Sequence, residues 1–132
     1  MSRKQAHLEM IQGIVNRLSH NSFLLKGWTV VLVSALFALA AKDKNALFIY
    51  LAYFPCIAFW CLDAYFLWQE RLFRSLYDHV RVMKEKDINY SMNVTQAEIA
   101  GVTWSDAFVS KTLLLFHGVV LVSIIIVMSL SL

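Results

Sequence analysis

The segment NSFLLKGWTVVLVSALFALAAKDKN (residues 21–45) decides the fold, because most of it is apolar. It also carries one charge close to the start of its apolar part. Within it, Phe23–Ala41 comprises 19 residues with a single charge, that of Lys26. A helix of this length spans about 28 Å, close to the thickness of the hydrocarbon core of a bilayer. A backbone in lipid must satisfy its own amide groups, so the segment predicts a transmembrane helix.

Two further segments have the same character. Ala46–Trp68 is a run of 23 residues whose single charge is Asp63, and Thr112–Leu132 is a run of 21 residues in which only His117 can ionise. The chain of 132 residues is 59% hydrophobic, which is too apolar for a soluble domain of this size. We therefore expect an all-α membrane protein, a single membrane domain over residues 1–132 with three transmembrane helices at 23–41, 46–68 and 112–132.

The segments outside the spans also predict helices. In residues 5–20, apolar side chains recur at spacings of three and four, which predicts an amphipathic helix that lies in the membrane interface or packs on neighbouring subunits. No glycine or proline interrupts the chain from Cys56 to Glu85, so we expect the second helix to extend into the cytoplasm as far as about residue 85. Residues 86–110 then form a cytoplasmic connection to the third span.

The distribution of basic residues predicts the orientation. Of the 12 lysines and arginines, only Lys42 and Lys44 lie in the first loop, and the others lie before the first span, at its start, or between the second and third spans. Basic loops stay on the cytoplasmic side, so we expect the N-terminus inside and the C-terminus outside. The net charge of +3 is then explained by topology. It also favours anionic lipid headgroups, and we expect no nucleic acid partner.

The three ionisable residues within the spans are predicted to lie in one layer. A hairpin that turns near Asp43 brings Lys26 level with about Cys61, with Asp63 half a turn away, and His117 reaches a similar depth. Three interpretations remain open. Lys26 extends its ammonium to the headgroups while Asp63 caps a neighbouring group, or a Lys26–Asp63 pair joined by His117 holds the bundle, or the layer is an ion path or gate.

Two helix faces suit contacts with other helices. Gly27, Ser34 and Ala38 lie on a face of small residues on the first helix, which permits close helix contact. On the second helix the polar face of Asp63 continues through Glu70, Arg74 and Arg81, and fits a contact between identical subunits or the wall of a vestibule. Three helices cannot bury so many polar groups in one protomer. We therefore expect a homo-oligomer in the lipid bilayer, with a cytoplasmic protein as a possible further partner.

Signals for catalysis are weak. Arg74 and His79 match the R-x4-H pattern of HEPN ribonucleases, in which the histidine serves in acid–base chemistry. On one helix these two side chains point about 140° apart, so a compact site would need two protomers. Cys56 and Cys61 are separated in the same way and have no further metal ligands nearby. We expect a protein that is not an enzyme and has no metal and no cofactor.

Two segments of the amino-acid sequence resemble a known protein family. The segments MIQGIVNRLSHNSFLLKGWTVVLVSALFALAAKD (Met10–Asp43) and FWCLDAYFLWQERLFRSLYDHVR (Phe59–Arg81) resemble the RipA family of small bacterial inner-membrane proteins, which are described as octameric. The resemblance implies a ring of eight subunits in the bacterial inner membrane, with a periplasmic C-terminus. The architecture is also similar to that of the membrane protein that accompanies type VI CRISPR nucleases, which implies a pore in antiviral defence. The cytoplasmic part is shorter here than in those relatives, which puts a sensing role in doubt.

These observations lead to three hypotheses. The first is a homo-oligomeric inner-membrane protein that forms or gates an ion-conducting pore in stress response or phage defence. The second is a non-conducting membrane scaffold that recruits a cytoplasmic partner through Glu70–Lys86, and conductance separates it from the first. The third is a membrane-tethered HEPN-like ribonuclease, which requires that RNA cleavage be lost on His79→Ala.

Overall fold

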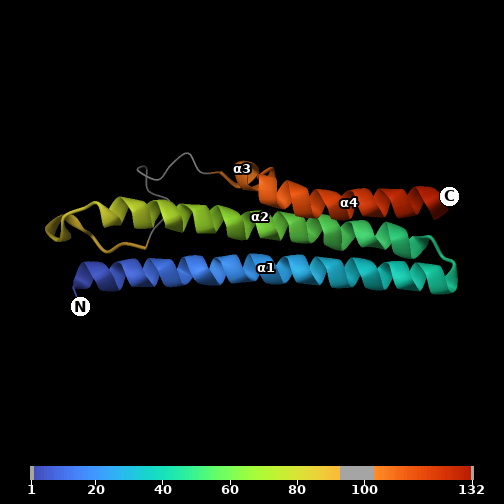
Figure 1. Cartoon of the computed structure of the whole chain (residues 1–132), viewed down its shortest axis with the longest axis horizontal. Coiled ribbons are helices and arrows are strands. Elements are labelled where there is room, and N and C mark those ends of the chain that lie inside the picture. Colours follow the sequence, from blue (N-terminus) through green and yellow to red (C-terminus); the bar gives the residue numbers. More distant parts are fainter. Residues whose placement is uncertain (1, 93–102, 132) are drawn as a thin grey trace.

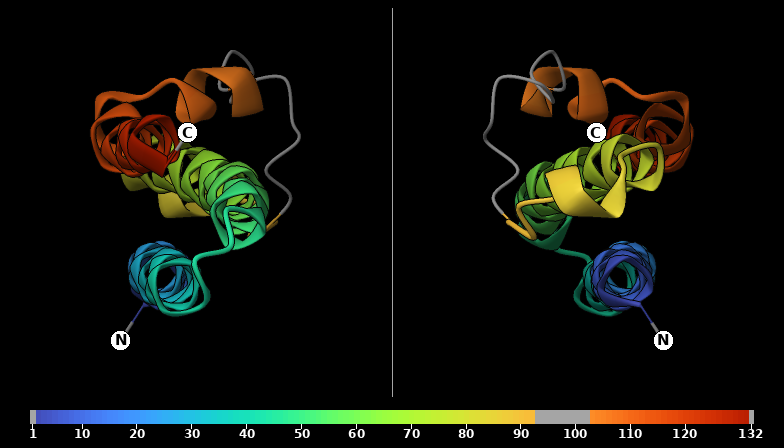
Figure 2. Two further views of the ribbon diagram at one scale, coloured as in Figure 1. Left: turned by 90° about the vertical axis from the view of Figure 1, so that its right-hand side faces the viewer. Right: turned by 90° about the vertical axis from the view of Figure 1, so that its left-hand side faces the viewer.

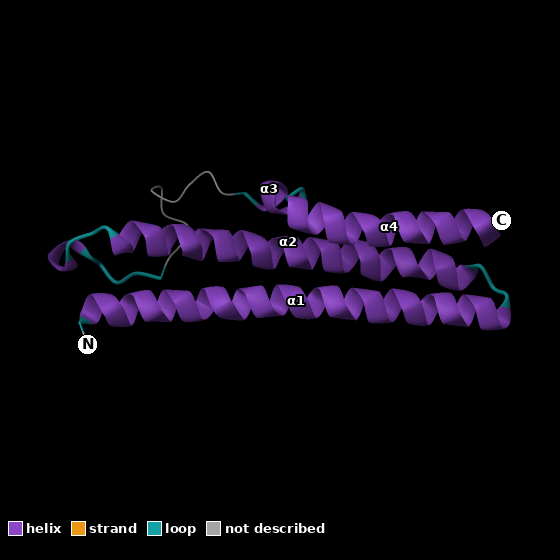
Figure 3. Ribbon diagram, viewed as in Figure 1, coloured by secondary structure: helices purple, strands orange, loops and turns teal. Residues whose placement is uncertain are grey.

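The computed structural model describes residues 2–92 and 103–131. This part of the chain is helical and contains no strand. Three long helices lie side by side, with α2 between α1 and α4, and neighbouring helices run antiparallel (Figures 1 and 2). Figure 3 shows that short loops join the helical segments where they are described. The elements in chain order are α1 (Arg3–Asp43), α2 (Leu47–Arg81), the 3-10 turn η1 (Glu85–Asp87), α3 (Trp104–Phe108) and α4 (Lys111–Ser131).

The three long helices are each long and apolar enough to cross a membrane. Most of their apolar surface points outward, since only 17% of the most apolar stretch of α1 and of α4 is buried, and 33% of that of α2. Phe54, Leu115 and Leu130 are 76%, 73% and 84% exposed. Soluble proteins of this size rarely expose so much apolar surface to water, whereas lipid solvates such a surface favourably. The surface therefore fits a multi-pass membrane protein.

Helix α1 is one continuous helix of 41 residues, about 60 Å long at 1.5 Å per residue. The predicted separation of residues 5–20 from the first span is therefore wrong. The polar residues His20–Ser22 lie within the helix, and the only side-chain cap at its start is a capping box between Ser2 and Gln5. Residues 5–20 continue in the same helix as the apolar segment 23–41.

Packing explains why the N-terminal part of α1 stays helical. Ile11 is fully buried in a cluster with Leu72 and Leu76 of α2 and with Ile88, which follows η1. Most helical stability in proteins comes from such burial of an apolar face. Helix α2 ends at Arg81, earlier than the predicted end near residue 85, because the chain after it folds back onto this cluster.

The hairpin between α1 and α2 sets their register. Helix α1 ends in a left-handed residue, Lys44, with φ of 52°. The side chain of Asn45 then accepts a hydrogen bond from the backbone N–H of Leu47, 3.0 Å away, which starts α2. This turn brings Lys26 level with Asp63, which follows the predicted level, Cys61, by two residues along α2.

The connection to the third span is partly helical. Of the predicted connection 86–110, residues 93–102 lie outside the described part of the chain. The short helix α3 docks on α2 through two indole groups: Trp60 Nε1 donates to the carbonyl of Phe108 at 3.0 Å, and Trp104 Nε1 donates to the carbonyl of Cys61 at 3.2 Å. These bonds hold the start of α4 beside the middle of α2.

We expect the packing at the start of α1 to weaken in acid. His7 is only 4% exposed and lies edge-on to Tyr90, with ring centroids 5.3 Å apart. Burial holds the pKa of His7 below its ordinary value of 6.5, so the unfolded chain binds the proton more tightly than the folded one. The stability that neutral His7 contributes is complete above pH 6.5 and falls as the pH drops from there toward the lower folded pKa.

Hydrogen exchange, corrected for its intrinsic pH dependence, measures this effect. Amides of residues 83–92 should exchange several-fold faster at about pH 5.5 than at about pH 7.5. His7→Leu should remove the difference, because leucine takes no proton. His20→Leu, at an exposed position of the same helix, should leave it unchanged. Equal exchange at both pH values in the unaltered protein would contradict the prediction.

Candidate functional site: a buried charge cluster

Each long helix contributes one ionisable side chain to a single cluster at the carboxylate of Asp63. Lys26 Nζ from α1 lies 2.6 Å from Asp63 Oδ2, and His117 Nε2 from α4 lies 2.8 Å from the same oxygen. The side chains of Asp63 and His117 are fully buried, and that of Lys26 is 17% exposed. Of the three residues that the sequence placed in one layer, Lys26 and His117 therefore both contact Asp63, and we call the three residues the charge cluster.

Ser22 is a fourth member that the sequence analysis did not identify. Its hydroxyl donates to Asp63 Oδ1 and accepts from Lys26 Nζ at 2.8 Å. Both carboxylate oxygens are thus hydrogen-bonded. The signal for this role was the spacing, because Ser22 precedes Lys26 by four residues and so shares its helix face.

The geometry bears on the interpretations of Lys26. A lysine at the centre of a span costs about 3 kcal/mol on insertion scales, and less where it reaches the headgroups. Here the ammonium is bonded to Asp63, which favours an interpretation with a Lys26–Asp63 contact over one in which the two side chains have separate partners. The charges of Lys26 and Asp63 balance each other. Two interpretations are therefore favoured: a Lys26–Asp63 pair, joined by His117, that holds the bundle together, and an ion path or gate.

Aromatic rings fix the position of His117. The ring of Trp60 stacks on it at 5.7 Å with an interplanar angle of 12°, and stacks on Phe108 from α3 at 4.6 Å. An ionised carboxylate can only accept, so the N–H of His117 Nε2 donates to Asp63. The other nitrogen, Nδ1, is buried without a hydrogen-bond partner among the described residues. A buried polar atom of this kind is a place where a rearranged side chain, a water or an ion could bind.

The charge cluster is accessible from one end of the bundle. A pocket of about 340 Å³ reaches it from the side of Ser19 and Glu70, and Ser22, Lys26 and Thr112 are among its other polar lining residues. On the opposite side the bundle closes through an apolar cluster that includes Val33, Cys56 and Ile124. An ion that entered this pocket would reach Lys26 and stop there.

The predicted contact face of small residues is exposed in the described part of the chain. Gly27, Ser34 and Ala38 are exposed on the side of α1 that faces away from α2, and a Cβ atom on Gly27 would meet no other atom within 4 Å. The buried face of α1, which includes Thr29 and Val33, lies on the opposite side. The small-residue face is thus available to lipid or to a second copy of the chain.

The polar face of α2 beyond Asp63 carries local ion pairs. Glu70, whose side chain is 12% exposed, lies 3.4 Å from Arg74, and Arg81 lies 3.9 Å from Asp78. The side chains of both arginines are more than half exposed. Pairs with exposed arginines contribute little to stability, so these two ion pairs do not by themselves explain the charges of this face.

The remaining chemical candidates are not brought together. Arg74 and His79 lie on the continuous helix α2, about 140° apart, and do not form a compact pair in one protomer. Cys56 and Cys61 are free thiols. Across residues 2–92 and 103–131, no group of three or more histidine, cysteine or acidic side chains could hold a metal ion.

Comparison with known proteins adds no assignment. No protein-family model matches the chain, and no characterised protein or solved structure matches it either. The resemblance to the RipA family remains an expectation from the sequence. The charge cluster is therefore the main basis for inferring a function.

Proposed function

We propose that this protein is a homo-oligomeric membrane protein that forms or gates an ion-conducting pore, and that the charge cluster is its gating element. One observation carries the proposal: a single buried carboxylate, Asp63, bonds side chains of both other spans. Ionisable residues inside membranes are costly, and they commonly mark paths for ions or protons. Breaking the bonds of Asp63 would remove the polar links from α2 to α1 and from α2 to α4 at the same time.

The proposal requires more than one copy of the chain. The pocket beside the charge cluster ends at apolar packing, so conduction would pass between protomers or follow a separation of the helices. The exposed face of Gly27, Ser34 and Ala38 suits a close helix contact with a second copy. The number of eight subunits, membership of the RipA family and a role in stress response or phage defence rest on the resemblance.

The proposed location is the bacterial inner membrane. The basic residues favour a cytoplasmic N-terminus and a periplasmic C-terminus. In this orientation the first part of α1 and the last part of α2 stand in the cytoplasm as an antiparallel pair. The pocket beside the charge cluster then opens toward the cytoplasm.

Ion flux through liposomes that contain the purified protein tests the proposal. Asp63→Asn keeps the shape of the side chain and removes its charge, which weakens the bonds that close the bundle. A change of about 1.4 kcal/mol in the gating equilibrium would alter the flux about tenfold. Asp43→Asn, at the exposed C-terminal end of α1, should leave the flux unchanged.

Two results would contradict parts of this proposal. If neither the unaltered protein nor any variant conducts while the oligomer is intact, the protein is not a pore under these conditions. If Asp63→Asn and the unaltered protein conduct equally, the pore remains and the charge cluster is not its gate. Integrity of the oligomer must be measured on the same samples.

A second candidate function is a non-conducting scaffold. The side chains of Arg74 and Arg81 are 58% and 61% exposed, and that of Asp78 is 71% exposed, on the outer face of the α2 extension. This charged face fits a cytoplasmic protein partner. A ribonuclease, the third hypothesis, would need Arg74 and His79 from different protomers.

A further inference from the structure

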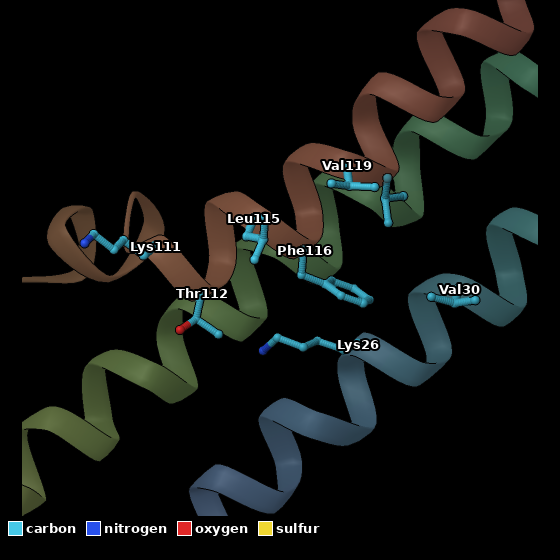
Figure 4. Close-up of a pocket in the computed structure, with 8 residues that line it drawn as sticks. Lys26, Val30, Lys111, Thr112, Leu115, Phe116 and Val119 are labelled. Carbon is cyan, nitrogen blue, oxygen red and sulfur yellow. The ribbon is translucent and has the colours of Figure 1, made fainter.

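A groove runs between α1 and α4, because both helices pack on α2 and touch each other little. Its volume is about 620 Å³. Figure 4 shows Lys26 facing Thr112 and Phe116 across it. The polar lining residues Lys26, Lys111 and Thr112 lie at the end where α4 begins, and the apolar ones are Val30, Leu115, Phe116, Val119 and Val120.

The two lysines at the polar end differ in their charge balance. Lys26 is paired with Asp63 across the bundle. Lys111 is exposed and has no ion pair in the described part of the chain. This end of the groove thus has a lysine without an ion pair next to Thr112 in the chain, while the rest of its length is apolar.

We propose that this groove binds one anionic phospholipid molecule. Lys111 and Thr112 donate hydrogen bonds to its phosphate, and an acyl chain lies along Val30, Phe116, Val119 and Val120. Phosphate oxygens accept strong charge-assisted hydrogen bonds from ammonium groups. A lysine just beyond the end of a span attracts anionic headgroups in the same way.

Charge complementarity favours a lipid over a helix of a second copy. The apolar face of another helix would cover Lys111 without supplying a counter-charge, and would leave a buried ammonium unpaired. A phosphate supplies that charge, and its acyl chain matches the apolar lining. The inference requires that the helices span a bilayer, but it does not require that the protein conducts ions. It places a lipid headgroup beside the partly exposed side chain of Lys26.

Native mass spectrometry tests the proposal. The protein is released from liposomes that contain equal amounts of phosphatidylglycerol and phosphatidylcholine with the same acyl chains. The unaltered protein should retain phosphatidylglycerol in preference, on the order of fivefold for one lysine near the headgroup. Lys111→Gln should abolish the preference, and Lys86→Gln, at an exposed position outside the groove, should retain it.

A second variant tests the apolar part of the groove. Val30→Trp should fill the groove and reduce the retention of both lipids without altering a charge. Full retention in Val30→Trp, or an unchanged preference in Lys111→Gln, would overturn the proposal. If Val30→Trp left lipid retention intact and also separated the oligomer into protomers, the groove would be an interface between copies instead of a lipid site. If Val30→Trp does not fold, Lys111→Gln decides alone, because its position is at the surface.

Discussion

Replacement of Asp63 by leucine is expected to lower the free energy of unfolding by about 3 kcal/mol. In the variant Lys26 loses its ion-pair partner, which lies 2.6 Å away in the unaltered protein, and its charge stays unpaired inside the bundle. His117 loses the acceptor of its hydrogen bond. Removing one member of a buried pair costs more than the pair itself contributes, because an uncompensated charge remains. Reversible unfolding in mixed detergent micelles measures the loss.

The double variant Lys26→Met with Asp63→Leu isolates the charge effect. Methionine removes the stranded ammonium, so the double variant should recover most of the stability lost by Asp63→Leu alone. Asp43→Leu, at the exposed end of α1, should change the stability by less than about 0.5 kcal/mol. If the double variant is as unstable as Asp63→Leu, the loss comes from packing around the removed carboxylate and not from Lys26.

The sequence predicted the depth of the charge cluster, but it left the bonds of the cluster as one of three open interpretations. Depth follows from the rise per residue and from a short hairpin, and the predicted level of Lys26 missed Asp63 by only half a turn. Bonding depends on how each helix is rotated about its own axis. A span that is apolar on all sides contains little information about that rotation, and in α4 only His117 indicates it.

Ser22 shows the limit of local pattern. The polar residues His20–Ser22 follow an amphipathic segment and precede an apolar one, which is the pattern of a helix start. In the structure they form one turn inside α1, and the hydroxyl of Ser22 bonds the charge cluster instead of a backbone amide. The spacing of Ser22 from Lys26 allows this role, and the position of Asp63 on the neighbouring helix decides it.

The ends of the long helices also depended on tertiary packing. No glycine or proline marks the end of α2 at Arg81, so composition alone allowed the helix to continue. The chain turns because Ile88 is buried against Leu72 and Leu76. The same apolar cluster holds Ile11 and keeps the first part of α1 in line with the span. One long-range cluster thus decides two helix boundaries that local sequence left open.

The continuity of α1 gives a second large expected effect. Spin labels at Glu9 and Leu39, both exposed on one helix, should give a single narrow distance distribution near 45 Å when labelled chains are diluted with unlabelled ones, so that only distances within one chain are measured. The labelling requires a background with Cys56→Ala and Cys61→Ala. A short, broad distribution in this protein would mean that residues 5–20 turn away from the span, as an interfacial helix would.

Asn21→Pro should break this helix just before its apolar segment 23–41. Proline removes one backbone hydrogen bond and clashes with the preceding turn, at a cost of about 3 kcal/mol, so the distance should shorten and its distribution broaden. Arg3→Pro, at the first position of α1, should leave the distance unchanged because proline is tolerated there. The kink would also displace the adjacent Ser22 from Asp63. If the variant still forms the oligomer, altered ion flux together with a shortened distance would link the straightness of α1 to the charge cluster.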